Sequence, residues 1–170
     1  MRTGMQLKVV GPLGNGFPQK NKKAFLIGGG IGIPPMLELA KELDCEKQIV
    51  LGFRDELFLL EDFRNRGQIY IATEDAVPEQ REMYLMRSVR TDWMQTSLCL
   101  RQPDSLRAIK EYAAEQNIEC WISMEERMAC GIGACLACVC KSKEKDAHSN
   151  VKNKRICKEG PVFLAQEVEF

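Results

Sequence analysis

Short apolar runs alternate along the chain with segments that repeat apolar positions at helical spacing. The runs predict buried strands and the periodic segments predict amphipathic helices. The predicted strands cover residues 24–27, 48–53, 68–72, 97–100 and 118–123. The predicted helices cover residues 36–43, 57–64 and 105–116. Because strands that alternate with helices favour a parallel sheet covered on both faces, the predicted fold class is α/β with a doubly wound parallel sheet.

A glycine-rich loop separates the first predicted strand from the first predicted helix. Its glycines are Gly28, Gly29, Gly30 and Gly32. Pro34 and Pro35 suit the first turn of a helix, and a helix N-terminus behind a glycine loop can bind a phosphate group. The spacing departs from the G-x-G-x-x-G fingerprint because Ile33 occupies the third glycine position. These glycines are therefore candidate cofactor-binding residues, and a tight turn without a ligand is the alternative.

The balanced charge of the chain favours no highly charged partner. The 170 residues include 24 Lys and Arg and 24 Asp and Glu, so we expect neither nucleic acid nor an anionic membrane as a partner. No apolar stretch approaches the roughly 20 residues of a membrane-spanning helix, and the opening MRTGMQ is not a secretory signal. We expect a soluble, cytoplasmic protein.

Four of the eight cysteines have the spacing of a plant-type [2Fe-2S] cluster site. Cys130, Cys135 and Cys138 form a C-x4-C-x2-C run, and Cys157 is the distant fourth ligand. The loop between them contains glycine and alanine, which allow backbone N–H groups to approach sulfur. Structural zinc, which usually takes two C-x2-C pairs, is the alternative. The sequence therefore predicts an electron-transfer cluster held by these four residues.

The other cysteines are not predicted to be ligands, although Cys140 would be the substitute if one of the four were wrong. Cys45, Cys99 and Cys120 border apolar segments and are expected in the core. The polar, basic stretch 141–155 predicts a solvated hairpin, with a docking surface for an acidic partner as the alternative. His148, the only histidine, receives no role. No side chain is predicted to be catalytic, because no nucleophile has a plausible base and the chemistry belongs to cofactors.

Five segments together resemble the iron–sulfur electron-transfer subunits of NAD-dependent dihydroorotate dehydrogenases. They are GPLGNGF (11–17), GGGIGIPP (28–35), LGFR (51–54), ISMEERMACGIGACLACVC (122–140) and RICKEGPVF (155–163). The resemblance implies a ferredoxin-reductase-like protein in which a β-barrel holds FAD, an α/β domain receives NAD and a small C-terminal lobe holds the [2Fe-2S] cluster. It also implies a partner, an FMN-containing catalytic subunit that oxidises dihydroorotate in pyrimidine biosynthesis.

The resemblance implies three parts for this chain: the end of a flavin barrel and a linker (1–20), an NAD-binding-like domain (21–124) and a cluster lobe (125–170). Residues 7–10 correspond to the last barrel strand, so most of the barrel is expected to be absent, with little independent FAD binding and no activity of the chain alone. Residues 74–78 and 99–103 differ from the turns that the family places near the nicotinamide. The resemblance therefore supports NAD binding less than it supports the cluster.

Two other functions stay open from the sequence. The chain could serve another flavin and iron–sulfur oxidoreductase, which only its partner subunit would reveal. Alternatively, zinc could occupy the four cysteines in a non-redox interaction module, which the metal content would decide.

Overall fold

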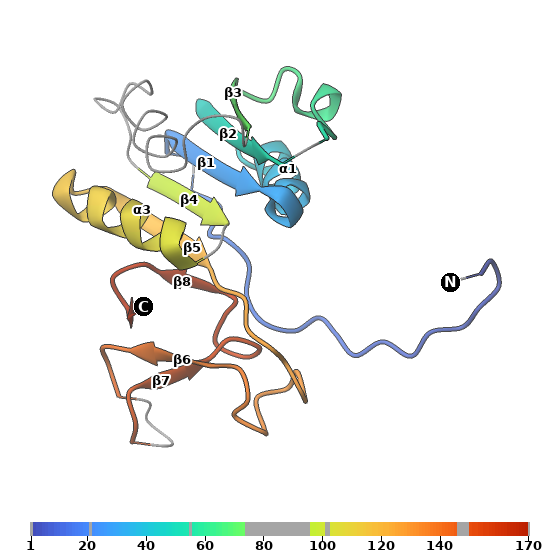
Figure 1. Ribbon diagram of the computed structural model, residues 1–170, viewed down its shortest axis with the longest axis vertical. Helices are drawn as coiled ribbons and strands as arrows, with labels where there is room; N and C mark the ends of the chain where they lie inside the picture. Colours follow the sequence, from blue (N-terminus) through green and yellow to red (C-terminus); the bar gives the residue numbers. More distant parts are fainter. Residues whose placement is uncertain are drawn as a thin grey trace.

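A six-stranded sheet lies at the centre of the computed structural model, which describes residues 2–20, 22–54, 56–73, 96–100, 103–145 and 150–169. The strand order is β3-β2-β1-β4-β5-β8 (Figure 1). The strands are β1 (Ala24–Gly29), β2 (Lys47–Phe53), β3 (Gln68–Thr73), β4 (Thr96–Leu100), β5 (Glu119–Ser123) and β8 (Val162–Leu164). All neighbours are parallel except β8, which runs antiparallel to β5. The predicted parallel α/β sheet is confirmed.

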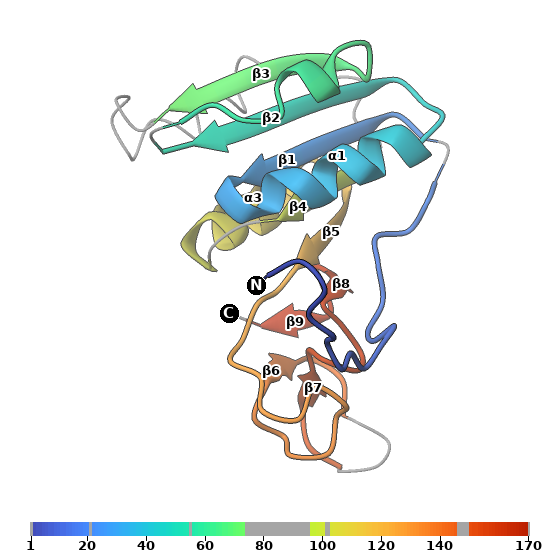
Figure 2. The ribbon, with the colours of Figure 1, turned by 90° about the vertical axis from the view of Figure 1, so that its right-hand side faces the viewer.

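Helices α1 (Ile33–Glu42) and α3 (Pro103–Glu115) cover opposite faces of this sheet (Figures 1 and 2). Successive strand residues point to alternate faces. Leu26 therefore packs in the core beneath α1, whereas its neighbours Phe25 and Ile27 pack in the core beneath α3. This arrangement is the doubly wound architecture. Among the described helices, none has the length and apolar character needed to cross a bilayer.

The helix predicted at residues 57–64 is wrong. Only a 3₁₀ turn, Glu61–Phe63, forms there. Leu59 has a φ of 59°, in the left-handed region, which interrupts a right-handed helix. Phe58 instead packs edge-on against Phe53, with ring centroids 5.4 Å apart. Aromatic packing onto β2 thus replaces the amphipathic helix that the apolar spacing predicted.

The C-terminal residues build a second, three-stranded antiparallel sheet. Its order is β7-β6-β9, with β6 (Val139–Ser142), β7 (Asn153–Arg155) and β9 (Val168–Glu169). β8 comes from the same region of the chain but joins the large sheet (Figure 2). One continuous core contains Leu106 of α3, Ile122 of β5, Cys140 of β6 and Val168 of β9. The small sheet and the α3 face of the large sheet are therefore packed as one body.

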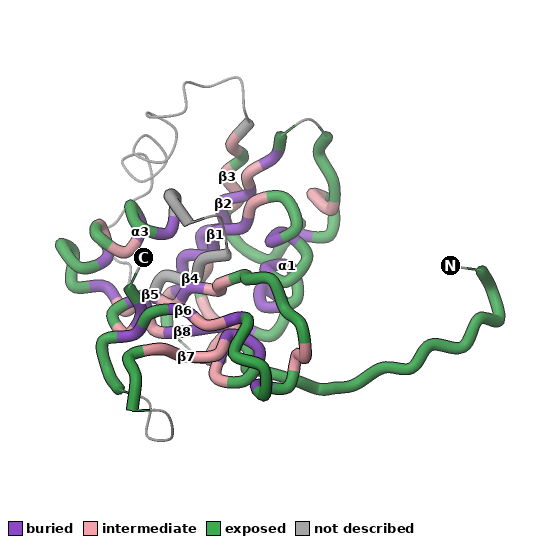
Figure 3. The backbone as a smooth tube through the Cα atoms, turned by 60° about the horizontal axis from the view of Figure 1, so that its bottom comes forward, coloured by how far each residue is buried: buried purple, intermediate pink, exposed green. Residues whose placement is uncertain are grey.

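Residues 2–16 form an extended, exposed arm whose first part leads away from the body of the protein (Figures 1 and 3), while the Asn15 amide near its end donates to the Gly160 carbonyl at 2.7 Å. The strand expected at residues 7–10 is wrong: none of the described residues pairs with this stretch. Leu7, Val9 and Val10 are 59%, 81% and 74% exposed. Without a neighbouring strand, this stretch forms no ladder of hydrogen bonds.

The segment that follows the arm is fixed to β5 by a polar cluster. Lys20 forms an ion pair with Glu119, and its ammonium group lies 5.5 Å from the centre of the Trp121 ring. The Trp121 indole N–H donates to the same carboxylate at 2.6 Å. The hydrogen bond from Lys20, followed by that from Trp121, lowers the pKa of Glu119. Glu119 is therefore a pH-dependent anchor of this segment.

We expect Glu119→Gln to destabilise the protein at pH 7 by up to about 1 kcal/mol, the usual range for a partly exposed ion pair. A lowered folded-state pKa stabilises the protein above the unfolded value, near 4.3, and this contribution disappears as pH falls through the folded-state pKa. Urea unfolding of the variant and the wild type should therefore converge toward pH 3. Glu61→Gln, which removes an exposed ion pair with Arg64, is the control and should leave the free energy of unfolding unchanged. An equal difference at both pH values would contradict the assignment.

Candidate functional site

Three of the four predicted ligands lie in the irregular loop between β5 and β6. Gly131 and Gly133 have φ values of +70° and +80°, so the chain turns through conformations that other residues rarely adopt. Gly133 is buried, and a Cβ there would lie 2.9 Å from Cδ of Lys158. The small residues noted in the sequence are thus required by the path of the loop, which bends its backbone N–H groups toward sulfur.

Cys130 accepts two of these N–H groups. The amides of Ala134 and Cys135 donate to its Sγ atom at 3.3 and 3.4 Å. The pKa of Cys130 is lowered to about 6. The hydrogen bond from the Cys135 amide is the main cause, and further hydrogen bonds to the sulfur add to it. Cys130 is therefore predisposed to be a thiolate, the form in which cysteine binds metal.

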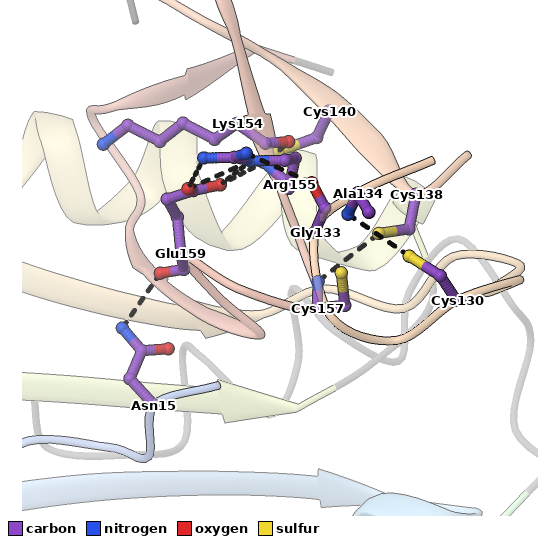
Figure 4. A network of polar contacts seen from close by, with 10 residues as sticks. All are labelled: Asn15, Cys130, Gly133, Ala134, Cys138, Cys140, Lys154, Arg155, Cys157 and Glu159. Atoms are coloured by element: carbon purple, nitrogen blue, oxygen red, sulfur yellow. Dashed lines mark hydrogen bonds and ion pairs between the residues drawn. The ribbon is translucent and has the colours of Figure 1, made fainter. Parts of the chain in front are cut away.

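Cys138 and Cys157 meet although 19 residues separate them. The amide of Cys157 donates to Cys138 Sγ at 3.4 Å, and the Cys138 side chain lies beside that of Cys157. That contact and burial raise the pKa of Cys157, and Cys130 lies close enough to contribute. The backbone amide of Cys135 joins Cys135 to Cys130 Sγ in the same way. The four sulfurs thus gather as two pairs, and Figure 4 shows Cys130, Cys138 and Cys157 directed toward a common region.

The donor chemistry of this group fits an iron–sulfur cluster. Four thiols, with N–H donors already directed at two of the sulfurs, provide soft ligands and the hydrogen bonds that stabilise negative charge on sulfur. Within the described ranges, no three Cys, His, Asp or Glu side chains surround a single ion position. In a [2Fe-2S] cluster each iron takes two cysteines, which matches the observed pairs.

Two of the remaining cysteines, Cys120 and Cys140, are buried in the core. Cys140 is buried and donates its S–H to the carbonyl of Lys154 at 3.5 Å, and burial raises its pKa (Figure 4). Cys120 is fully buried, which confirms its expected core position, whereas Cys45 is only half-buried. The side chain of Cys99 lies outside the described residues. Cys140 therefore has a structural partner of its own.

A polar network that the sequence analysis missed connects the arm to the cysteine loop (Figure 4). Arg155 pairs with Glu159 and donates from Nη1 to the Gly133 carbonyl at 3.1 Å. The side-chain amide of Asn15 donates to the Glu159 carbonyl at 3.0 Å and accepts from the Val162 amide at 3.3 Å. Asn15 lies in segment 11–17, Gly133 in 122–140 and the others in 155–163, so the resemblance was the only available signal.

The candidate glycines lie at the carboxyl end of β1. Gly28 and Gly29 end the strand, and a 3₁₀ turn, Gly30–Gly32, leads into α1. Strand order reverses between β1 and β4, and open α/β sheets bind ligands at such a switch point. A Cβ on Gly28 would lie 2.9 Å from Cγ of Met36, so close packing of α1 also requires this glycine.

The N-terminus of α1 offers fewer backbone donors than the sequence suggested. The Ile33 amide donates to the Gly30 carbonyl, and Pro34 and Pro35 have no N–H. Helix α1 begins three residues before the predicted start because these prolines form its first turn. The departures at 74–78 and 101–102, and His148, lie outside the described residues.

Comparison with known sequences gives a consistent set of relatives. Residues 125–169 match the iron-sulfur cluster binding domain of dihydroorotate dehydrogenase B. The chain is 41% identical over 176 residues to a dihydroorotate dehydrogenase B (NAD(+)) electron transfer subunit from Caldanaerobacter subterraneus, covering 100% of this chain and 69% of that protein. It is 40% identical over 179 residues to the subunit of the same name from Bacillus velezensis, covering 98% and 67%.

Two solved structures share the fold. An NADH-dependent reduced ferredoxin-NADP oxidoreductase superposes with a TM-score of 0.77 at 24% identity, covering 96% of this chain and 60% of that one. The C-terminal domain of a hydrogenase from Pyrococcus furiosus superposes with a TM-score of 0.55 at 16% identity, covering 67% of this chain and all of that domain. At these identities, both comparisons show only that the backbone folds are alike.

Proposed function

The chain belongs to the family of dihydroorotate dehydrogenase B electron transfer subunits, and from this premise we propose that it passes electrons between a catalytic dehydrogenase subunit and FAD and NAD. The partner would be an FMN-containing subunit that oxidises dihydroorotate in pyrimidine biosynthesis. The observation that carries the proposal is the gathering of four cysteine sulfurs in two pairs within the matched domain.

We assign Cys130 and Cys135 to one iron of a [2Fe-2S] cluster, and Cys138 and Cys157 to the other. When bound, the cluster supplies one-electron transfer. The chain contributes N–H donors to the sulfurs, glycines that let the loop close around the site, and a core that buries Cys138 and Cys157. Cys135 is exposed, which leaves one side of the site open toward a partner.

Residues 21–124 would carry the nicotinamide site and residues 125–170 the cluster. The position of Gly28, Gly29, Gly30 and Gly32 at the switch point of the sheet supports a nucleotide site there. The two prolines at the start of α1 argue for few backbone contacts to phosphate. A cytoplasmic location is part of the proposal, supported by Cys130, Cys135, Cys138, Cys140 and Cys157 being thiols rather than disulfides.

Anaerobic purification followed by iron, zinc and acid-labile sulfide analysis tests the proposal. We expect about two irons and two sulfides per chain and an S = 1/2 paramagnetic resonance signal after reduction with dithionite. Stoichiometric zinc without labile sulfide would refute electron transfer and favour a zinc-binding interaction module.

A further inference from the structure

The peptide unit between Gly133 and Ala134 is held at both ends. Its carbonyl oxygen accepts a hydrogen bond from Arg155 Nη1 at 3.1 Å, and its N–H donates to Cys130 Sγ at 3.3 Å (Figure 4). Gly133 is buried, with a φ of +80°, so the unit has an orientation that few other residues could give it. A guanidinium group and a candidate ligand sulfur are thus joined through a single amide.

Arg155 is itself fixed in place. Its side chain is 16% exposed, and Nε lies 3.1 and 3.0 Å from the two carboxylate oxygens of Glu159. Nη2 also bonds to Glu159, and the same carboxylate accepts the Arg155 backbone N–H at 2.7 Å. Because the planar fork is bound on one side, its Nη1 group is directed at Gly133. Asn15 holds the backbone of Glu159 from the arm.

Hydrogen bonds in a chain polarise one another, and a charged donor strengthens the effect. The guanidinium draws electron density toward the Gly133 carbonyl, which makes the Ala134 N–H a better donor to sulfur. Hydrogen bonds to cluster sulfurs are among the factors that set the reduction potential, because they stabilise the more negative, reduced state.

We propose that Arg155 is a positioning residue that raises the reduction potential of the cluster by orienting and polarising the Gly133–Ala134 peptide, which donates to Cys130. The proposal rests on the proposed function, since it requires a cluster at the four cysteines. It adds a residue that binds neither iron nor nucleotide.

The test compares Arg155→Gln with Lys154→Gln in the cluster-loaded, full-length protein. Lys154 is the matched control because it is adjacent on β7 and carries the same charge. Its ammonium group instead pairs with Glu167 at 2.5 Å and lies over Phe163. Iron and sulfide are measured first, and the midpoint potential is then obtained by redox titration followed by paramagnetic resonance.

We expect Arg155→Gln to keep its iron and sulfide and to shift the midpoint to a more negative potential. At the wild-type midpoint, the ratio of reduced to oxidised cluster should fall about three- to tenfold, as for loss of one hydrogen bond's net contribution. The hyperfine coupling of an exchangeable proton near the reduced cluster should also weaken. Lys154→Gln should change neither quantity.

An unchanged midpoint in loaded Arg155→Gln, or an equal shift in Lys154→Gln, would overturn the proposal. If Arg155→Gln does not retain iron, Arg155→Lys provides the test, because it keeps the charge but loses the fork. Its midpoint should lie below that of the wild type, and an identical midpoint would refute a role for the fork. Wild-type protein without iron and sulfide would instead refute the proposed function itself.

Discussion

Replacing Cys135 with serine is expected to abolish the [2Fe-2S] cluster. Cys135 is the most exposed of the four candidate ligands, and its amide is also the leading cause of the lowered pKa of Cys130. A serine hydroxyl keeps the loop backbone intact but replaces a soft thiolate by a hard oxygen. Iron and acid-labile sulfide should fall from about two each to well below one per chain, and the visible absorption of the oxidised protein should disappear.

Two cysteine variants serve as controls for this prediction. Cys140→Ser changes a buried thiol bonded to the Lys154 carbonyl, and Cys45→Ser changes a half-buried thiol beside β2. Both should keep full iron and sulfide content. If Cys135→Ser retained the wild-type spectrum while Cys140→Ser lost it, the second ligand position would have to be reassigned from Cys135 to Cys140.

Truncating Ile122 to alanine is expected to weaken the whole body of the protein and the cluster lobe together. Ile122 is completely buried in β5, where it pairs with Phe163 of β8. It belongs to the core that also contains Cys138, Cys140 and Cys157. Removing a buried isoleucine side chain costs about 2–5 kcal/mol, through lost transfer free energy and the cavity left behind. We expect the variant to unfold at a lower urea concentration than the wild type and to lose iron faster on dilution.

Ile49→Ala is the matched control for Ile122→Ala. Ile49 has the same side chain and is also completely buried, but it packs beneath α1 in the other core. Its free energy of unfolding should fall by a similar amount, whereas the rate of iron loss under native conditions should stay near that of the wild type. Equal iron-loss rates in the two variants would show that the lobe does not depend on the core it shares with β5.

The five parallel strands of the central sheet were predictable because their signal is local, whereas the antiparallel β8 was not predicted. Each buried strand is a short apolar run, and the observed strands contain or closely overlap the predicted ones. The helix at 57–64 failed because tertiary packing of Phe58 on Phe53 and the left-handed Leu59 overrode the apolar spacing. The strand at 7–10, which the resemblance implied, is absent because none of the described residues lies beside this stretch to pair with it.

The cysteine site was predictable in composition but not in its supports. Spacing alone selected four residues, and amide–sulfur hydrogen bonds join Cys135 to Cys130 and Cys157 to Cys138, while their role as ligands stays a prediction. The contact between Arg155 and the Gly133 carbonyl could not be predicted, since it joins positions 22 residues apart through a backbone atom that has no sequence signature. The link from Asn15 to Glu159 spans 144 positions and depends on the path of the whole chain.

The continuous core beneath α3 limits how this protein could be recombined with others. A crossover just after Ser123 would separate β8 from β5 and expose apolar side chains on both pieces. Such a chimera would have to rebuild a complementary surface before it could hold iron. A unit that begins at α3 keeps the lobe on its helix and on β5, but its new host must supply apolar side chains in the places of Phe25 and Ile27 beneath α3.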